Sequence, residues 1–262
     1  MSAFTPGVNS ENFPSLHVSY HQELCIATLN CPQNRNALNA SLLEQLNQLI
    51  DRLQQRSCKV LLLMAEGEYF CAGMDLAEIN QNDISSAKKL NRFSELLQRF
   101  HHANFLSVCY VKGHAIGGGC ALACACDLVY HGQQALFQFP EMLFGLVPAM
   151  AWEFIARRTG QQTMFRLAVT SGAIGTDKAQ ELGLSDGMFP SENDVFRQCC
   201  QWRKRLSLPS LKALKALRKH YCAEPEQHFS FSSQLLADRL NDKTVQQGIK
   251  DYLEEGKLPW LN

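Results

Sequence analysis

The sequence predicts an α/β fold in which short apolar strands alternate with amphipathic helices, followed by a helical region. Three observations predict it. Residues 59–65 form a continuous apolar run, the pattern of a strand buried on both faces. Apolar residues recur at helical spacing over 83–101, and helix signals dominate from Glu141 onward. Because strands that alternate with helices pair in parallel through right-handed crossovers, we expect a mostly parallel sheet.

The first third of the chain predicts a hairpin and a helix. Two short strands over 16–20 and 25–30 flank a tight turn. Ser41 and Glu44 then have the spacing of a capping box, in which two side chains satisfy backbone N–H groups at a helix start. We expect this helix to reach about Gln55, because apolar residues follow at helical spacing: Leu42, Leu43, Leu46, Leu49, Ile50 and Leu53.

The middle of the chain adds further strand–helix units. A second apolar run over 105–111 predicts another buried strand, and a short helix over 119–126 follows a run of glycines. Strand patterns return over 127–131 and 135–138. The chain has no internal repeat and no low-complexity linker, so we expect one α/β core with an appended helical region.

Composition and charge exclude several kinds of partner. The formal net charge is +0 at pH 7, which gives no bulk attraction for nucleic acid or an anionic membrane. No segment has the roughly 18–20 apolar residues of a membrane span, and the N-terminal residues lack the basic start and apolar core of a signal peptide. The 11 cysteines form no C-x-x-C pair, which favours free thiols in a reducing cytosol over a zinc or redox site. We therefore expect a cytoplasmic protein without a metal.

Two glycine-containing loops suggest a site for an oxygen anion. Gly117, Gly118 and Gly119 follow an apolar run, and residues without Cβ let a ligand approach bare backbone. The helix expected behind them would direct free N–H groups and the positive end of its dipole at that ligand. A second such loop lies at 69–76. We expect backbone N–H groups from both loops to meet at one oxygen and form an oxyanion hole.

Four motifs, in this order and spacing, resemble those of the crotonase (enoyl-CoA hydratase/isomerase) superfamily. They are Phe70-Cys-Ala-Gly-Met-Asp-Leu, the run Ile116-Gly-Gly-Gly-Cys-Ala-Leu-Ala with Asp127 after it, the Pro140-Glu141 segment, and residues 175–187. The similarity runs from about residue 16 to the C-terminus.

The resemblance implies a four-turn ββα spiral core, which we place at residues 1–200, and a helical C-terminal trimerisation region at 201–262. It also implies a homotrimer, or a hexamer of paired trimers. The substrate would be an acyl thioester carried on CoA or on the phosphopantetheine arm of an acyl carrier protein, with no other cofactor. The backbone N–H groups of Met74 and Gly118 would form the oxyanion hole. Neighbouring residues would line the substrate site: Ala72, Gly73, Asp75, Leu76, Gly117 and His114.

The chain departs from the hydratases of this family at one of their two acid–base carboxylates. Those enzymes place one Glu two residues after the third glycine, where this chain has Ala121, and a second in the Pro-Glu segment, where it has Glu141. The aromatic and aliphatic neighbours of Glu141 predict an apolar setting, which favours the neutral form of a carboxyl group. We expect Glu141 to be the catalytic residue, which handles protons at the substrate Cα and at a departing hydroxyl.

Two kinds of single-carboxylate enzyme in this family fit these residues. One is the dehydratase of polyketide β-branching cassettes, a hydro-lyase that removes water from 3-hydroxy-3-methylglutaryl carrier protein. The segments at 140–149 and 252–260 look most like this enzyme, and we expect its activity. The other is the Δ3,Δ2-enoyl-CoA isomerase of fatty-acid oxidation. A third alternative is a catalytically silent homologue that serves as an interaction module, which Ala121 favours and Glu141 opposes.

The site residues also have simpler structural alternatives. The glycines could form a dinucleotide-binding turn, although Leu122 stands where that motif needs Gly or Ala. Glu141 could merely stabilise a helix N-terminus, and Asp75 is more readily explained as a helix cap than as a catalytic group. Arg157 and Arg158 could bind a substrate carboxylate or phosphate, or could simply lie on a surface helix.

Overall fold

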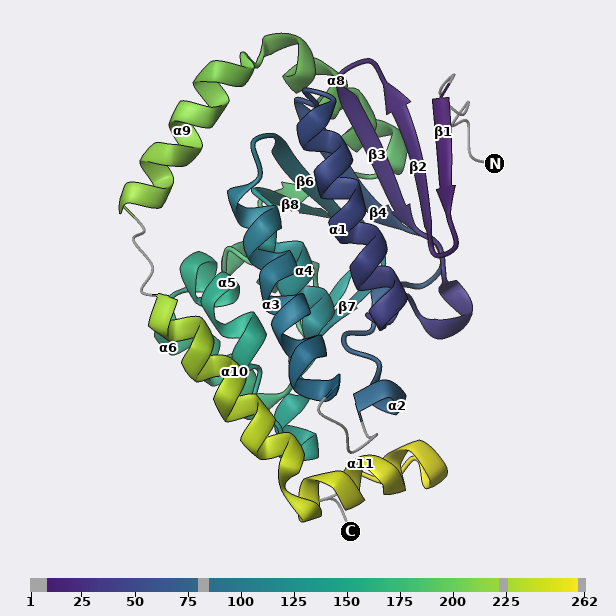
Figure 1. Cartoon of the computed structure of the whole chain (residues 1–262), viewed down its shortest axis with the longest axis vertical. Helices are drawn as coiled ribbons and strands as arrows, with labels where there is room; N and C mark the ends of the chain where they lie inside the picture. The colour runs from purple at the N-terminus through teal and green to yellow at the C-terminus, as the bar shows by residue number, and fades with distance from the viewer. Residues whose placement is uncertain (1–8, 80–84, 222–225, 259–262) are drawn as a thin grey trace.

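The computed structural model describes residues 9–79, 85–221 and 226–258. Its large sheet has seven strands in the order β1-β2-β3-β4-β6-β8-β10 (Figure 1). The β1–β2 and β2–β3 pairs are antiparallel, and the later pairs are parallel, which confirms the predicted sheet. The strands are β1 (Asn9–Phe13), β2 (Leu16–His21), β3 (Leu24–Leu29), β4 (Val60–Ala65), β6 (Leu106–Val111), β8 (Leu128–His131) and β10 (Gly187–Met188).

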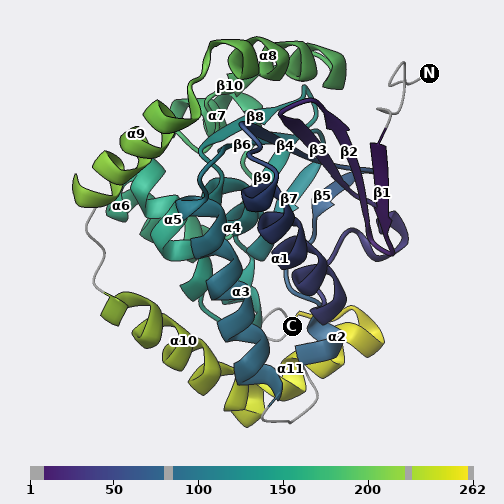
Figure 2. The same cartoon turned by 45° about the horizontal axis from the view of Figure 1, so that its top comes forward.

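A second, three-stranded parallel sheet lies beside the large one (Figure 2). Its strands, in spatial order, are β5 (Tyr69–Cys71), β7 (His114–Ile116) and β9 (Leu136–Gln138). Each follows one strand of the large sheet and precedes a helical segment, so the chain repeats a ββα unit as the predicted spiral requires. β9 falls within the strand pattern predicted at 135–138, whereas β5 and β7 were not predicted, because so few residues beside a glycine loop show no clear alternation.

Helices cover both faces of the large sheet. On one face lie α1 (Ala40–Gln55), α3 (Ser85–His102) and α4 (Gly118–Ala125), and on the other lies α8 (Glu192–Arg205). β4 shows this arrangement, because its side chains alternate between the two faces. Leu61 and Leu63 pack in the hydrophobic cluster on the face covered by α1, α3 and α4, while Val60 and Leu62 pack in the cluster that contains Val195 of α8. Each such side chain contributes about 1.5–3 kcal/mol when fully buried.

The N-terminal cap of α1 differs from the prediction. The side chain of Asn39 accepts the N–H of Leu42 at 2.8 Å, whereas Ser41 lies inside the helix and its hydroxyl accepts a hydrogen bond from Gln45 at 2.8 Å. The predicted capping box at Ser41 and Glu44 is therefore wrong. Asn and Ser are about equally good caps, so the sequence alone could not choose between two positions so close together.

The predicted boundary between core and C-terminal region, at residues 200 and 201, lies within α8. This helix runs from Glu192 to Arg205 and packs on the large sheet through Val195 and Cys199. After it, α9 (Leu208–Tyr221) is fastened to the core by a buried carboxylate. Asp127 lies 2.8 Å from the Lys215 ammonium and 2.9 Å from the Arg218 guanidinium. Removing the Asp127 carboxylate would leave the nearly buried Lys215 ammonium without this opposite charge.

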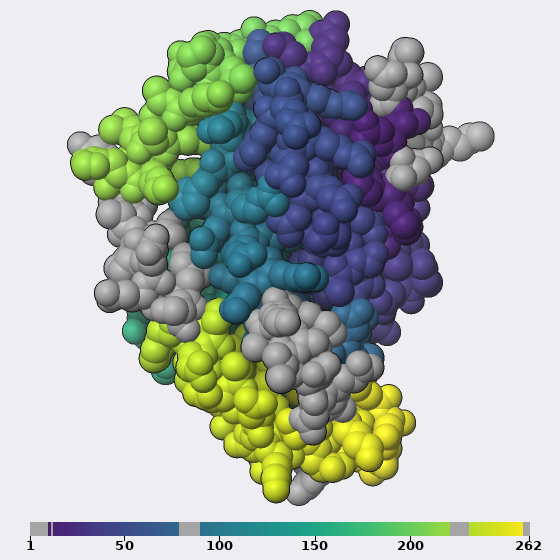
Figure 3. All heavy atoms as spheres, viewed as in Figure 1, coloured from purple at the N-terminus to yellow at the C-terminus, as the bar shows by residue number. Residues whose placement is uncertain are grey.

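Among the remaining helices, α10 and α11 lie at the lower end of the molecule in Figure 1. α10 packs against α3 and α5, and α11 reaches the 3₁₀ turn η2. α10 and α11 form the lower end of the surface in Figure 3. In the ranges given above, no helix is both long and apolar enough to span a bilayer. The elements are η2 (Glu141–Phe144), α5 (Ala149–Thr159), α6 (Gln161–Thr170), α7 (Thr176–Glu181), α10 (Glu226–Asn241) and α11 (Lys243–Glu255).

Candidate active site

The two predicted oxyanion loops meet in the structure. A Cβ built on Gly118 would lie 3.4 Å from the amide nitrogen of Met74, and one built on Gly73 would lie 3.2 Å from the amide nitrogen of Gly118. Leu38 donates to the Gly73 carbonyl at 2.8 Å and accepts from the Asp75 N–H at 3.2 Å, so the intervening Met74 amide faces away from Leu38. Gly118 begins α4, and the first N–H groups of a helix have no partner within it. The two amides therefore lie near each other, as the predicted oxyanion hole would require.

Close backbone packing holds these loops together. A Cβ on Gly119 would lie only 2.3 Å from the carbonyl oxygen of Cys71, so glycine is what lets α4 approach β5. The Cys71 sulfur accepts the N–H of Gly73 at 3.4 Å. Gly73 itself has φ +88°, a left-handed conformation that glycine adopts without strain. The separation of the Met74 and Gly118 amides is thus set by contacts that involve no ligand.

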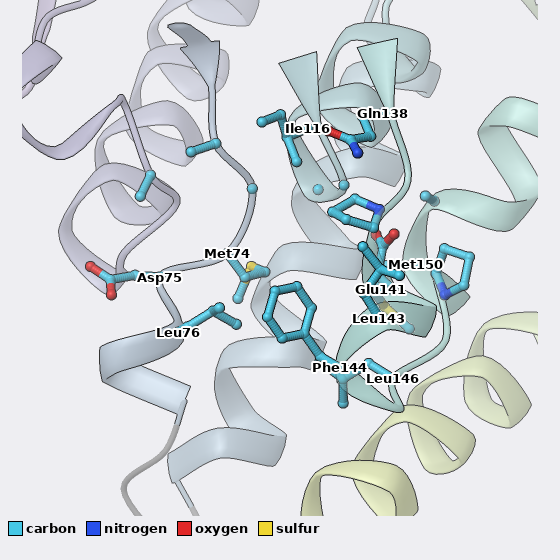
Figure 4. Close-up of a pocket in the computed structure, with 18 of the residues that line it drawn as sticks. Met74, Asp75, Leu76, Ile116, Gln138, Glu141, Leu143, Phe144, Leu146 and Met150 are labelled. Atoms are coloured by element: carbon cyan, nitrogen blue, oxygen red, sulfur yellow. The ribbon is translucent and has the colours of Figure 1, made fainter. Parts of the chain in front are cut away.

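Glu141 lies beside the same loops. It begins η2 directly after Pro140, and its carboxylate rests against bare backbone, because a Cβ on Gly117 would lie 2.9 Å from Oε1. Gly117 has φ +52° and donates its N–H to the Gln138 carbonyl at 2.8 Å. Met74 and Glu141 come from segments on either side of the site, while the Asp75 carboxylate points away from Glu141 (Figure 4). A thioester whose oxygen is held by the two amides would thus have Glu141 beside its α-carbon.

Burial raises the pKa of Glu141 from 4.5 to about 7, and a backbone hydrogen bond offsets this only in part. Oε2 is buried and has no hydrogen-bond partner within the described residues, so the ionised form loses the stabilisation that water would give. The predicted apolar setting is confirmed. A carboxyl group whose pKa lies near neutrality can both accept and return a proton.

A cavity of about 650 Å³ joins the oxyanion loops to Glu141. The C-terminal helices supply one wall: Leu236 and Leu240 of α10 line it, and the Tyr252 ring of α11 stands edge-on to Phe144 with ring centroids 5.0 Å apart. This wall was not predicted from the sequence. Helical spacing shows which face of a helix is buried, but it does not show what that face packs against.

The cavity accounts for five of the six residues predicted to contact substrate, which are Ala72, Gly73, Asp75, Leu76 and Gly117. Asp75 also has the capping role, because its carboxylate accepts the Ala77 N–H at 3.0 Å at the start of α2 (Leu76–Ile79). His114 is the exception. It does not belong to the described lining, and its ring packs edge-on against Tyr69 with centroids 4.9 Å apart. Its position does not support the predicted substrate contact.

Core packing fills the position of the absent hydratase carboxylate. Ala121 lies on α4, is 0% exposed and is not part of the described cavity lining. The two candidate substrate-binding arginines serve the fold as well, since Arg157 pairs with Glu153 at 2.8 Å and Arg158 with Asp186 at 3.0 Å. Glu141 is thus the carboxylate that the described site directs at the oxyanion loops.

Known proteins are similar to this chain in sequence and in fold. The model of the enoyl-CoA hydratase/isomerase family matches residues 19–262. The chain is 26% identical over 252 residues to the bacillaene synthase dehydratase PksH of Bacillus subtilis (strain 168), which covers 95% of this chain and 97% of that protein. It is 34% identical over 206 residues to the 2,3-dehydroadipyl-CoA hydratase of Escherichia coli (strain K12), which covers 78% of this chain and 80% of that one. The crystal structure of PksH from Bacillus subtilis matches with a TM-score of 0.87 at 24% identity, over 95% of this chain and 100% of that one. The chain therefore belongs to the enoyl-CoA hydratase/isomerase family, with the crotonase fold, and is one of its hydro-lyases.

Proposed function

We propose that this protein removes water from a 3-hydroxy-3-methylacyl thioester, namely 3-hydroxy-3-methylglutaryl carrier protein, in polyketide β-branching. The observation that carries the proposal is the Glu141 carboxylate against Gly117, next to the loops that supply the two amides, with Ala121 where the family's hydratases place a second Glu. Similarity to PksH along nearly the whole chain supports the polyketide setting. The reaction needs no cofactor beyond the carrier arm, and the free thiols of the described cysteines favour a cytoplasmic location.

Glu141 would act twice in this elimination. Ionised Glu141 takes a proton from the α-carbon, and the amides of Met74 and Gly118 stabilise the charge that develops on the thioester oxygen. The enolate then collapses, the bond from Cβ to the hydroxyl breaks, and a double bond forms between Cα and Cβ. Protonated Glu141 returns its proton to the departing hydroxyl, so that water and 3-methylglutaconyl thioester are the products. A tertiary hydroxyl leaves readily once an enolate has formed beside it, so one carboxylate suffices.

Three substrates test this proposal. The purified protein is incubated with 3-hydroxy-3-methylglutaryl carrier protein, with a 3-enoyl-CoA and with crotonyl-CoA, and the acyl groups are followed by mass spectrometry and NMR. Loss of the mass of one water from the first is the expected result. Double-bond migration in the second without dehydration of the first would make the protein an isomerase, which a single glutamate could also serve. Absence of turnover on all three would favour the interaction module.

The rate should depend on pH through Glu141. Because the ionised carboxylate is the form that takes the α-proton, kcat/KM should rise about tenfold per pH unit below the Glu141 pKa and level off above about 7. An ordinary exposed glutamate would give the plateau already near pH 5. Stopped-flow or quenched assays between pH 5 and 9, at constant ionic strength, measure the midpoint. A flat profile over this range would contradict the role of Glu141 as the base.

We also propose that the protein assembles as a homotrimer, alone or paired into a hexamer. α6, α9 and α10 lie along one side of the molecule (Figures 1 and 2) and expose large apolar side chains there: Phe165, Val169, Leu214, Leu217 and Phe231. Exposed apolar groups of this size commonly mark protein–protein interfaces. Light scattering on the eluting protein should give three or six times the chain mass, and Leu214→Glu should reduce it.

A further inference from the structure

Arg239 of α10 forms a hydrogen bond with the turn that begins at Glu141. Its Nε donates to the carbonyl of Gly145 at 2.8 Å, and Nη1 lies 3.1 Å from Oδ2 of Asp242. Gly145 ends η2 in a left-handed conformation with φ +68°, and its N–H returns to the Glu141 carbonyl. The Leu146 N–H donates to the same Glu141 carbonyl at 3.0 Å. The guanidinium is therefore separated from the backbone of Glu141 by one short turn.

The same arginine connects this turn to both C-terminal helices. Asp242 caps α11, because Oδ1 accepts the N–H groups of Thr244 and Val245 at 2.9 and 3.4 Å. On α10, Leu236 and Leu240 lie close in sequence to Arg239 and line the cavity. A charged donor to a carbonyl makes a stronger hydrogen bond than a neutral one. Arg239 thus fixes the spacing between the C-terminal wall and η2.

We propose that Arg239 is a positioning residue for Glu141: it holds Gly145, and through it the turn at residues 141–145, at the place where the carboxylate meets the substrate α-carbon. The inference rests on Glu141 as the acid–base group of the proposed function, but not on the identity of the acyl chain. Arg239 does not belong to the described cavity lining, so it acts through the turn and not on the substrate.

The test compares Arg239→Gln with Arg239→Lys. A displacement of a catalytic group by about 1 Å can cost about 10²-fold in rate, so we expect kcat of Arg239→Gln to fall about 10–10²-fold with KM nearly unchanged. A looser turn admits water to the Glu141 carboxylate, which would move the midpoint of the kcat/KM profile below pH 7. Lys retains one charged donor and should recover part of kcat. Any thioester that the protein turns over serves as substrate, so failure of the carrier-protein substrate does not affect this test.

Two control variants separate positioning from general loss of structure. Asp242→Asn removes the ion pair but leaves the donation from Arg239 to Gly145, and Arg52→Gln breaks a comparable ion pair with Glu11 far from the site. Both should keep kcat within a few-fold. Hydrogen exchange gives a readout without turnover, because the amides of Gly145 and Leu146 should exchange about tenfold faster in Arg239→Gln only. Unchanged kcat and exchange in Arg239→Gln, or an equal loss in either control variant, would overturn the proposal.

Discussion

Glu141→Gln should abolish dehydration while leaving the fold intact. Gln has nearly the same shape but can neither take the α-proton nor return one to the departing hydroxyl. Positioned proton transfer contributes about 10²–10⁴-fold in rate, and here one residue serves two transfers, so we expect kcat to fall at least about 10³-fold. Single-turnover assays at saturating protein measure the loss. Full turnover by the variant would remove Glu141 from the mechanism.

The stability of the same variant provides an internal control. Because burial raises the pKa of Glu141 to about 7, the folded protein holds this proton more tightly than the unfolded chain does, and stability contributed by the neutral form is lost as the pH rises from about 4.5 through 7. Each tenfold change in the ionisation constant corresponds to about 1.4 kcal/mol, so the ionised group costs up to about 3 kcal/mol above that range. Glu141→Gln should therefore unfold at a higher urea concentration than the wild type at pH 8, with the difference shrinking toward pH 4. A less stable variant at pH 8 would mean that its lost activity reflects damage to the fold.

Gly119→Ala should cause the second largest loss of activity, because it moves the two proposed oxyanion donors apart without replacing an ionisable group. The new methyl would lie 2.3 Å from the Cys71 carbonyl oxygen and 2.9 Å from the Cys71 Cβ. Carbon atoms attract best at about 3.5–4.0 Å, so α4 must move away from β5 and carry the Gly118 amide with it. Loss of one oxyanion donor costs about 10²–10³-fold in kcat, and the forced shift should destabilise the protein by about 1–3 kcal/mol.

Gly172→Ala is the matched control for this substitution. Gly172 lies just after α6, and a Cβ built there has no neighbour within 4 Å. The variant should keep both kcat and the urea midpoint of the wild type. Assay of the two alanine variants side by side, together with binding of a thioester analogue, distinguishes a displaced oxyanion hole from a general cost of replacing glycine. Equal activity of Gly119→Ala and Gly172→Ala would show that the tight contact at Cys71 does not set the donor spacing.

The sequence was informative about the fold where a pattern extends over several residues. The apolar run at 59–65 and the helical stripe at 83–101 each correspond to an observed element, because burial on two faces or on one face imposes its own period. Of the small sheet only β9 was predicted, since β5 and β7 are short and lie beside glycine loops, and the cap of α1 was misplaced by two residues. The predicted end of the core lies inside α8, which has the composition of a surface helix although one side packs on the sheet.

The site was predictable to the extent that it is built from local backbone. Glycines without Cβ mark close approach, and the structure brings Gly118, Met74 and Glu141 together as the motifs implied. Their chemical roles stay predictions. His114 does not line the described cavity, because sequence proximity to the glycines does not fix the direction of a side chain at a strand start. The hydrogen bond from Arg239 to Gly145 joins residues far apart in the chain, and such a contact leaves no local pattern in the sequence.

The cavity wall that α10 and α11 contribute is the last part of the site to be synthesised. The glycine loops and Glu141 are all synthesised by residue 145, but the side chains that enclose them extend to Leu258. Ribosomes add about 5–20 residues per second, so several seconds separate the synthesis of the glycine loops and Glu141 from that of the residues that enclose them. We therefore expect the cavity to be complete only after the C-terminal helices have been made and have docked.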